Sequence, residues 1–259
     1  MTKLFHVSDV HFGAEDPAAL DWFARCVADE KPDAVIMTGD LTMRARTREF
    51  EAGAAWLKGL GVPVTVEIGN HDVPYYSDFV RRILAPYRRY AAVERMLEQP
   101  LAVPGVTVVP LKTVARLQWR MDQSKGAVSD RSLAEALQLI AAAPQDHVIL
   151  IAAHHPLTDQ HLGEPMRTHG GEAALTKLAA AGADAVLTGH IHDPFDIPVE
   201  RAGRTVRMIG AGTLSKRLRS SPPAFNEIRV DGRRFETLSR TQSPAPKETL
   251  GEGRADAPV

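Results

Sequence analysis

The chain has 259 residues, of which 44% are hydrophobic, so it can bury a sizeable core as one large α/β domain or as two small ones. Its 31 basic and 32 acidic residues give a formal net charge of −1, a balance that does not favour nucleic acid or an anionic membrane as a partner. Cys26 is the single cysteine, which excludes an intrachain disulfide and fits a reducing compartment. Because the first residues carry no signal-peptide pattern and no apolar run reaches the roughly 18 residues of a membrane helix, we expect a cytoplasmic protein without a membrane span.

The first part of the chain predicts strands that alternate with helices. The predicted elements are a strand at 4–7, a helix from Pro17 to Lys31, a strand at 34–37, a helix at 47–60 and a strand at 62–68. This alternation favours parallel strands joined by right-handed crossovers. In such sheets ligands collect beyond the carboxyl ends of the strands, where Asp9, Asp40 and Asn70 lie.

The middle of the chain repeats this pattern after an arginine-rich segment. Residues 75–98 predict a helix interrupted at Pro86, whose five arginines favour a solvated face over a phosphate-binding patch: Arg81, Arg82, Arg88, Arg89 and Arg95. There follow a strand at 106–111, a helix at 130–142 capped by Ser129 or Asp130, a buried strand at 148–153, a helix at 173–181 and a strand at 185–188.

Beyond Asp196 the predicted structure becomes all-β. The runs 205–209, 224–230 and 234–238 are joined by turn signals such as Asp231-Gly232, and we expect antiparallel hairpins that close a second sheet. Residues 241–259 are rich in proline and poor in large apolar side chains, which is typical of a disordered tail. Residues 1–240 are therefore expected to form the folded domain.

Five short polar blocks each follow a run of apolar residues. They are Asp9-Val10-His11, Gly39-Asp40, Gly69-Asn70-His71-Asp72, His154-His155 and Gly189-His190-Ile191-His192. Asp9 and His11 share a face of an extended segment and could bind one metal ion, whereas a turn could send His190 and His192 to different ions. Asp40 is the best candidate for a bridging carboxylate, and the glycine before it would let the backbone turn sharply. Mixed oxygen and nitrogen ligands suit Mn, Fe, Zn, Co or Ni, and a pair of such ions suits hydrolysis at phosphorus.

Together the blocks resemble the full signature of the calcineurin-like metallophosphoesterases, over residues 9 to 192. This resemblance implies a four-layer α/β/β/α sandwich of two mixed sheets flanked by helices, with two divalent or mixed-valence metal ions, Mn and Fe favoured, at the strand ends. It implies that the first ion is held by Asp9, His11 and His192, that Asp40 bridges, and that the second ion is held by Asn70, His154 and His190.

The resemblance also implies catalytic roles. His71 is similar to the family histidine that contacts the scissile phosphate and protonates the leaving oxygen, and Asp72 is expected to orient it. The attacking group would be a metal-bridging hydroxide, since no serine or cysteine stands in a competing nucleophile context.

Within this family the blocks most resemble the class III cyclic nucleotide phosphodiesterases and their glycerophosphodiester-cleaving relatives. This implies a hydrolase of small phosphodiesters with no nucleic-acid partner, while the choice between monomer and homodimer stays open. The alternatives are a phosphomonoesterase, including a protein phosphatase, and a lipid A precursor pyrophosphatase, which typically has arginine where this chain has His71. A metal-free scaffold is the non-enzyme alternative, and the complete set of ligands argues against it.

Two further segments could touch the substrate. Residues 157–171 follow a predicted metal ligand and carry glycines and histidines, and Met43, Arg44 and Arg46 follow Asp40. An ordinary surface connection explains the first segment, and an exposed helix start explains the second, at least as well.

Overall fold

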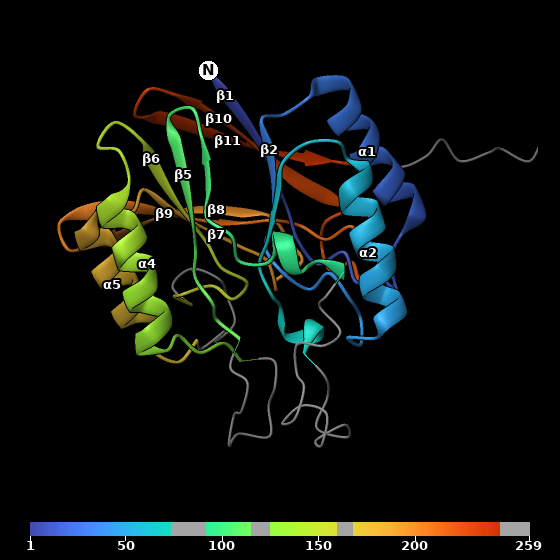
Figure 1. Cartoon of the computed structure of the whole chain (residues 1–259), viewed down its shortest axis with the longest axis horizontal. Helices are drawn as coiled ribbons and strands as arrows, with labels where there is room; N and C mark the ends of the chain where they lie inside the picture. Colours follow the sequence, from blue (N-terminus) through green and yellow to red (C-terminus); the bar gives the residue numbers. More distant parts are fainter. Residues whose placement is uncertain (74–91, 115–124, 160–167, 244–259) are drawn as a thin grey trace, which may run out of the picture.

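Two β-sheets pack face to face between two pairs of helices in the computed structural model, which describes residues 1–73, 92–114, 125–159 and 168–243 (Figure 1). The helices α1 (Pro17–Glu30) and α2 (Thr47–Gly59) cover one sheet, and α4 (Asp130–Ala142) and α5 (Gly171–Ala181) cover the other. The predicted four-layer α/β/β/α sandwich is confirmed.

The first sheet has the strand order β11-β10-β1-β2-β3. Its strands are β1 (Thr2–Val7), β2 (Ala34–Met37), β3 (Val64–Val66), β10 (Ala224–Asp231) and β11 (Arg234–Thr241). β1, β2 and β3 are parallel, as the crossovers through α1 and α2 require, whereas β10 and β11 are antiparallel to their neighbours. The sheet is therefore mixed, and three of its strands deliver their carboxyl ends to one edge.

The first helix shows how the local sequence sets these boundaries. The Asp16 carboxylate accepts the Ala18 N–H at 3.0 Å, Pro17 occupies the first helical position, and Lys31 ends the helix in a left-handed conformation. The apolar stripe of α1 places Phe23 against Phe5 and Phe225 of the sheet, with ring centroids 6.1 and 4.9 Å away. Burying each of these rings contributes about 1.5 to 3 kcal/mol, so this aromatic contact fixes α1 on the sheet.

The second sheet has the strand order β4-β5-β6-β7-β9-β8. Its strands are β4 (Leu101–Val103), β5 (Val106–Pro110), β6 (Val148–Ala152), β7 (Ala185–Thr188), β8 (Phe195–Arg201) and β9 (Arg204–Gly210). The four inner strands are parallel and the two outer strands are antiparallel to their neighbours. Of the two predicted caps of α4, Ser129 is the one observed, because its hydroxyl accepts the Ser132 N–H at 3.1 Å.

The facing surfaces of the two sheets form a buried apolar layer. Leu4, Ile36 and Ile228 of the first sheet meet Leu150 and Leu187 of the second, and all five are fully buried. Because helices cover the outer faces, the central strands are buried on both sides, which accounts for their continuous apolar runs. The polar residues that follow these strands are thus carried by a tightly packed support.

The prediction that the C-terminal hairpins close a second sheet is wrong for half of them. The β10–β11 hairpin joins the first sheet, where Ile228 lies opposite Leu4, and only β8 and β9 belong to the second sheet. This placement satisfies the free edge of β1 and puts Phe225 beside Phe5, with centroids 4.8 Å apart. The strands β4 and β8 were not predicted at all; β8 contains Pro198, which an edge strand tolerates.

The helix predicted over 75–98 is wrong at its carboxyl end. Residues 74–91, with four of its five arginines, lie outside the described residues. Glu94–Met96 form a short 3₁₀ helix, η4, and the chain then pairs with β3, since the Glu98 N–H donates to the Val66 carbonyl at 2.6 Å. Strand pairing in the tertiary structure therefore overrides local helix propensity here.

The predicted tail begins where β11 ends. Thr241 is the last residue of β11, and the Gln242 N–H donates to the Pro223 carbonyl at 2.8 Å. Residues 244–259 of the tail, like residues 160–167 of the predicted specificity segment, lie outside the described residues.

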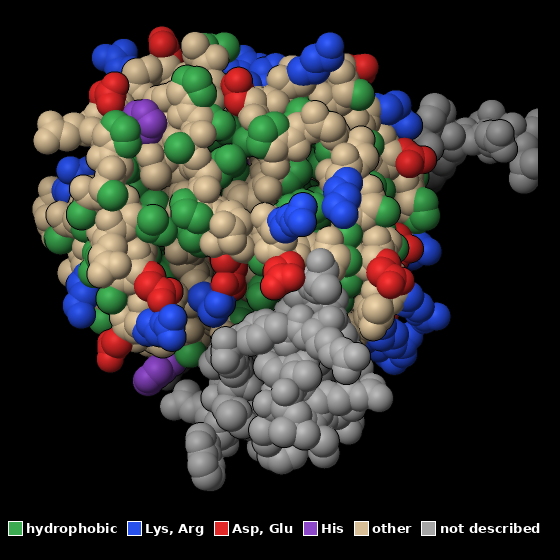
Figure 2. Space-filling view, viewed as in Figure 1, with side chains coloured by type: hydrophobic (Ala, Val, Ile, Leu, Met, Phe, Trp, Pro, Cys, Tyr) green, Lys and Arg blue, Asp and Glu red, His purple; other side chains and the backbone are tan. Residues whose placement is uncertain are grey.

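The surface carries charges of both signs. Lys, Arg, Asp and Glu side chains are interspersed around the face drawn in Figure 2, in keeping with the small net charge. Across the described ranges, every helix is too short or too polar to cross a membrane.

Candidate metal centre

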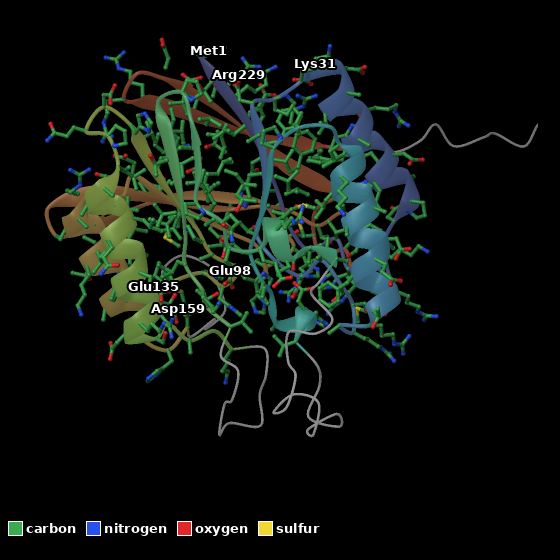
Figure 3. The ribbon with its side chains drawn as sticks, viewed as in Figure 1. Met1, Lys31, Glu98, Glu135, Asp159 and Arg229 are labelled. Carbon is green, nitrogen blue, oxygen red and sulfur yellow. The ribbon has the colours of Figure 1, made fainter. Side chains whose placement is uncertain are left out.

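The polar blocks meet at one edge of the sandwich. Asp9, Asp40 and Asn70 follow β1, β2 and β3 of the first sheet, and His154 and His190 follow β6 and β7 of the second. Figure 3 shows Asp159, which lies just beyond the His154 block, far from Met1 at the start of β1. The carboxyl ends of strands from both sheets therefore meet at one common site, as parallel pairing predicts.

The backbone at this edge is unusual. Nine non-glycine residues of the described ranges have positive φ, and five of them belong to the predicted metal ligands: Asp9 at 55°, His11 at 51°, Asp40 at 53°, His190 at 69° and His192 at 68°. A left-handed conformation costs an L-residue about 1 kcal/mol or more, so the surrounding structure holds these residues in place. Backbone strain of this kind concentrates at functional sites.

The glycines next to the ligands mainly provide space. Gly39 does have a positive φ of 94°, as the sequence predicted for a sharp turn. A Cβ on Gly69 would lie 2.1 Å from Asp40 Oδ1, and a Cβ on Gly189 would lie 2.5 Å from Asp9 Oδ2. These two glycines are required because the carboxylates of neighbouring blocks pack directly against their backbone.

The carboxylates of Asp9 and Asp40 are each anchored through one oxygen. The His190 N–H donates to Asp9 Oδ2 and the His71 N–H donates to Asp40 Oδ1, both at 2.8 Å. This leaves Asp9 Oδ1 and Asp40 Oδ2 facing the histidine rings. The anchoring fixes the orientation of both carboxylates without using the oxygens that face the centre.

One group of donors gathers around Asp9. Asp9 Oδ1 lies 3.2 Å from His192 Nε2 and 3.7 Å from His11 Nε2, and the two ring nitrogens are 3.3 Å apart. His192 Nδ1 lies 2.7 Å from the Arg217 carbonyl oxygen, an acceptor, so Nδ1 carries the hydrogen. In the neutral ring, His192 Nε2 therefore carries the lone pair, and it faces Asp9 Oδ1 and His11 Nε2.

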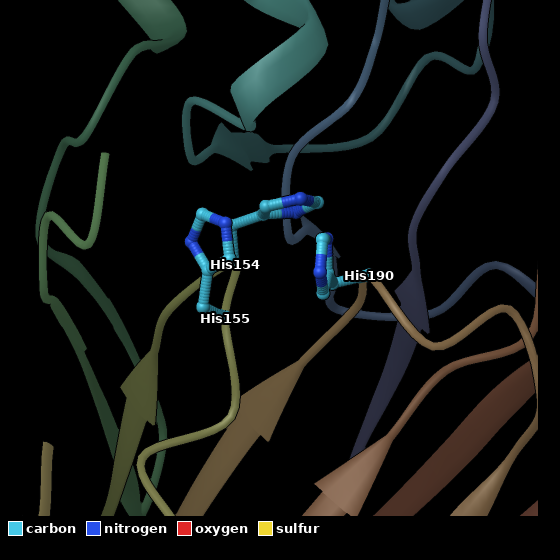
Figure 4. Close-up of side chains that lie close together, drawn as sticks. All are labelled: His154, His155 and His190. Carbon is cyan, nitrogen blue, oxygen red and sulfur yellow. The ribbon is translucent and has the colours of Figure 1, made fainter. Parts of the chain in front are cut away.

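The second group gathers around His154. His154 Nε2 lies 3.1 Å from Asn70 Oδ1 and 3.4 Å from Asp40 Oδ2, while its Nδ1–H donates to the Thr38 carbonyl at 2.8 Å. His190 joins this group with its ring 5.2 Å from that of His154 (Figure 4). Asp40 Oδ2 also lies 3.8 Å from His11 Nε2, so Asp40 stands between the two groups.

His190 and His192 therefore belong to different groups. Both residues have a left-handed backbone conformation. The extended geometry that would put their rings on one face therefore does not form, and the two rings diverge. Of the two arrangements that the sequence left open, the structure has the turn.

These donors fit metal ions on chemical grounds. Acceptor atoms and ring lone pairs converge at separations of 3 to 4 Å, an arrangement that repels unless a proton or a cation lies among them. Burial alone would lower the pKa of His154, but the adjacent Asp40 carboxylate raises it to about 9, so the surroundings of this ring favour a positive charge. Burial lowers the pKa of His11 and of His190 to about 4, which leaves both as neutral donors at pH 7.

His71 lies at the margin of these groups, where it forms a further possible ligand cluster with His11 and Asp40. Its ring is edge-on to that of His11 with centroids 4.9 Å apart, and its Nδ1–H donates to the Met43 carbonyl at 3.0 Å. The sequence expectation was that Asp72 orients this ring. The structure gives the contact at Nδ1 to Met43, one of the residues that sequence analysis had placed near the substrate.

Asp72 ties two blocks together. Its carboxylate accepts the Leu41 and Thr42 N–H groups at 3.2 and 2.7 Å, the Thr42 hydroxyl at 2.9 Å and the Gly69 N–H at 3.0 Å. Burial and the negative Asp40 raise the pKa of Asp72 to about 7, although these donors oppose the shift. Asp72 thus holds the segment after β2 against the turn η1 (Asn70–Asp72).

Two residues gain significance from the structure. His155 has its ring 4.6 Å from that of His190 and forms a possible ligand cluster with His154 and His190. Arg217 places Nη1 3.1 Å from His71 Nε2 and was missed, because it lies 25 positions beyond His192. No local sequence pattern gave this position, because it depends on β9 running parallel to β7, which brings the loop after β9 to the same edge.

The sequence matches the model of the family described as calcineurin-like phosphoesterase over residues 2–194. The chain belongs to this family. It is 27% identical over 207 residues to a Rhodopseudomonas palustris protein named probable cyclic nucleotide phosphodiesterase, covering 74% of this chain and 72% of that protein.

Solved structures share the fold of this calcineurin-like phosphoesterase. A dimetal phosphatase from Danio rerio superposes with a TM-score of 0.63 at 15% identity, covering 93% of this chain and 99% of the other. A purple acid phosphatase from yellow lupin (Lupinus luteus) seeds superposes with a TM-score of 0.65 at 12% identity, covering 93% and 51%. Identities this low bear on the fold alone.

Proposed function

We propose that this calcineurin-like phosphoesterase is a dinuclear metal-dependent phosphodiesterase that hydrolyses small phosphodiesters of the cyclic nucleotide or glycerophosphodiester type. The observation that carries the proposal is the pair of donor groups that share Asp40, with His71 beside them. A carboxylate between two groups of imidazole nitrogens is suited to two neighbouring cations.

The proposed ligands follow the two groups. Asp9, His11 and His192 would hold one ion, Asn70, His154 and His190 would hold the other, and Asp40 would contact both. We favour Mn and Fe among the metals that such a mixed oxygen and nitrogen set accepts. When bound, two ions would lower the pKa of water and neutralise phosphate charge.

His71 would act on the substrate. Its Nδ1–H is held by the Met43 carbonyl, so Nε2 is the nitrogen that can exchange a proton with a bound ester. In the protonated ring, Nε2–H would donate to the oxygen that leaves phosphorus, which needs a proton as its bond breaks. Asp72 would support this step indirectly, by fixing the turn that carries His71.

The preference for diesters rests on the likeness to the Rhodopseudomonas palustris protein and on the blocks that resemble class III phosphodiesterases. Residues 1–240 would form the catalytic domain. The cytoplasmic location, the tail from residue 241 and the oligomeric state stay predictions.

The test is turnover of matched esters by the metal-loaded protein. A cyclic nucleotide and a glycerophosphodiester would be compared with the monoesters that their hydrolysis releases, with Mn or Fe as the added ion. We expect kcat/KM to be larger for the diesters by at least about tenfold. A preference for monoesters would overturn the diester assignment, and no metal-dependent turnover of either would overturn the enzyme itself.

A further inference from the structure

Arg217 is held rigidly at the metal centre by its backbone. Its carbonyl accepts the Nδ1–H of His192, and its N–H donates to the Ser215 hydroxyl at 3.2 Å. Ser215 Oγ lies 2.7 Å from Thr213 Oγ1, which donates to the Asp9 carbonyl at 2.6 Å. The backbone of Arg217 is therefore connected to two of the proposed ligands of one ion, to His192 directly and to Asp9 through two buried hydroxyls.

The side chain of Arg217 reaches across this centre. Its Nη1 lies 3.1 Å from His71 Nε2, 3.3 Å from His11 Nε2 and 4.0 Å from Met43 Sδ. The guanidinium thus sits on the solvent side of the donors, next to the histidine that we assign to the leaving group.

The charge of Arg217 is not balanced by a nearby acid. Among the described residues no carboxylate oxygen lies within 4.0 Å of its guanidinium. Other arginines of the same part of the chain are paired: Arg207 with Asp196, Arg233 with Asp184, and Arg240 with Glu30 and Glu227. An arginine without an acid, over a site that would already hold two cations, is suited to an anion brought by a ligand.

We propose that Arg217 is a phosphate-binding residue, whose guanidinium binds the non-bridging oxygens of the substrate's phosphate group. The inference rests on the proposed function, because it concerns the same centre. A planar guanidinium donates two parallel N–H bonds to two phosphate oxygens, a geometry that a lysine ammonium does not reproduce. The role of Arg217 is to bind and orient the ester so that its leaving oxygen faces His71.

The test is binding of inorganic phosphate, the simplest ligand with the required oxygens. The metal-loaded protein would be titrated with phosphate by calorimetry, alongside Arg217→Gln and Arg217→Lys. Arg219→Gln is the matched control, since it removes an arginine from the same exposed stretch two residues on. Metal content would be measured for every variant, so that loss of phosphate binding is separated from loss of the ions.

We expect Arg217→Gln to keep its metal content and to bind phosphate about 10- to 100-fold more weakly, with a matching rise in KM for a diester. Arg217→Lys should recover part of this loss, and Arg219→Gln should bind like the wild-type protein. Unchanged phosphate affinity in Arg217→Gln overturns the inference while the phosphoesterase stands, and so does loss of metal from that variant. A wild-type protein that binds neither metal nor phosphate overturns both.

Discussion

The two sheets bring different chemistry to the metal centre. The strand ends of the first sheet carry all the oxygen ligands that we propose, namely Asp9, Asp40 and Asn70, whereas the second sheet carries only imidazoles, namely His154, His190 and His192. Each donor group nevertheless draws on both sheets, since Asp9 and His11 meet His192, and Asp40 and Asn70 meet His154. Metal binding should therefore join the two halves of the sandwich as well as supply chemistry.

Burial imposes a desolvation cost on the carboxylates of the first sheet. The carboxylates are fully buried, and they remain charged because backbone N–H groups of other blocks and the histidines offset their desolvation. Burial would raise the pKa of Asp9, but the His192 ring holds it below its usual range, and His154 does the same for Asp40. The acidic half of the site depends on the histidine half before any ion binds.

Removing the shared carboxylate should have the largest effect. Asp40→Ala leaves neither donor group with the oxygen that joins them, so we expect activity to fall by at least about 1000-fold. Turnover of a diester at saturating metal measures this loss. Asp196→Ala is the control, because that carboxylate lies on the surface and pairs with Arg207. Activity of Asp40→Ala within tenfold of wild type would contradict the proposed role of Asp40.

Removing His71 should separate catalysis from metal binding. Because His71 is not one of the seven proposed ligands and its Nδ1 is held by Met43, we expect His71→Ala to retain both ions. Its kcat should fall by roughly 10²- to 10⁴-fold, the range typical of a lost proton donor. His147→Ala, which changes a histidine at the opposite end of β6, should leave kcat unchanged. An empty metal site in His71→Ala would instead make it a ligand.

Metal removal should weaken the contact between the sheets. At a free ion concentration about 100 times the dissociation constant, binding stabilises the folded state by about 2.7 kcal/mol, and for a chain of this size that is on the order of 5 to 10 °C in Tm. Thermal unfolding with and without a chelator measures the shift. In Asp40→Ala, most of this metal-dependent shift in Tm should be lost. An equal shift in Asp40→Ala would show that the ion binds elsewhere.

Much of the site could be predicted from the sequence, because apolar runs and strand alternation fix where strands end. That logic located Asp9, Asp40, Asn70, His154 and His190 at one edge. It could not tell which way a side chain turns after its strand, so the divergence of His190 and His192 stayed open. The contact between His71 and Met43 likewise depends on how two separate turns pack.

The parts of the fold that were missed depend on long-range pairing. The β10–β11 hairpin could have joined either sheet by its alternation alone, and the free edge of β1 decided the matter. Arg217 was missed for a related reason, since its position follows from β9 lying next to β7 in space. Local patterns identify elements, whereas the partner of an edge strand is set by the rest of the core.

A smaller effect is expected at Glu67, a carboxylate of the first sheet that differs from Asp9 and Asp40. It is buried, and neither of its oxygens has a hydrogen-bond partner among the described residues. Burial, and then the negative Glu98, raises the pKa of Glu67 well above its usual range. The folded state therefore binds a proton that the unfolded state has released, so stability falls as the pH rises above the unfolded pKa of about 4.3.

Glu67→Gln should remove this fall in stability with rising pH. We expect the variant to gain stability over wild type as the pH rises from 5 to 8, by about 1.4 kcal/mol per pH unit at most, as measured by urea unfolding. Glu227→Gln is the matched control of opposite sign, because pairing with Arg240 and Arg229 lowers the pKa of Glu227 despite burial. A stability difference between Glu67→Gln and wild type that does not change with pH would contradict the assignment.

The central claim is that two cations bind between the sheets and share Asp40. Crystals of the protein grown with Mn²⁺ and measured at the manganese absorption edge test it most directly, because anomalous scattering locates each ion without reference to any expected ligand. We predict two ions, one contacting Asp9, His11 and His192 and the other contacting Asn70, His154 and His190, with Asp40 contacting both. A single ion, or a second ion that does not contact Asp40, would contradict the account.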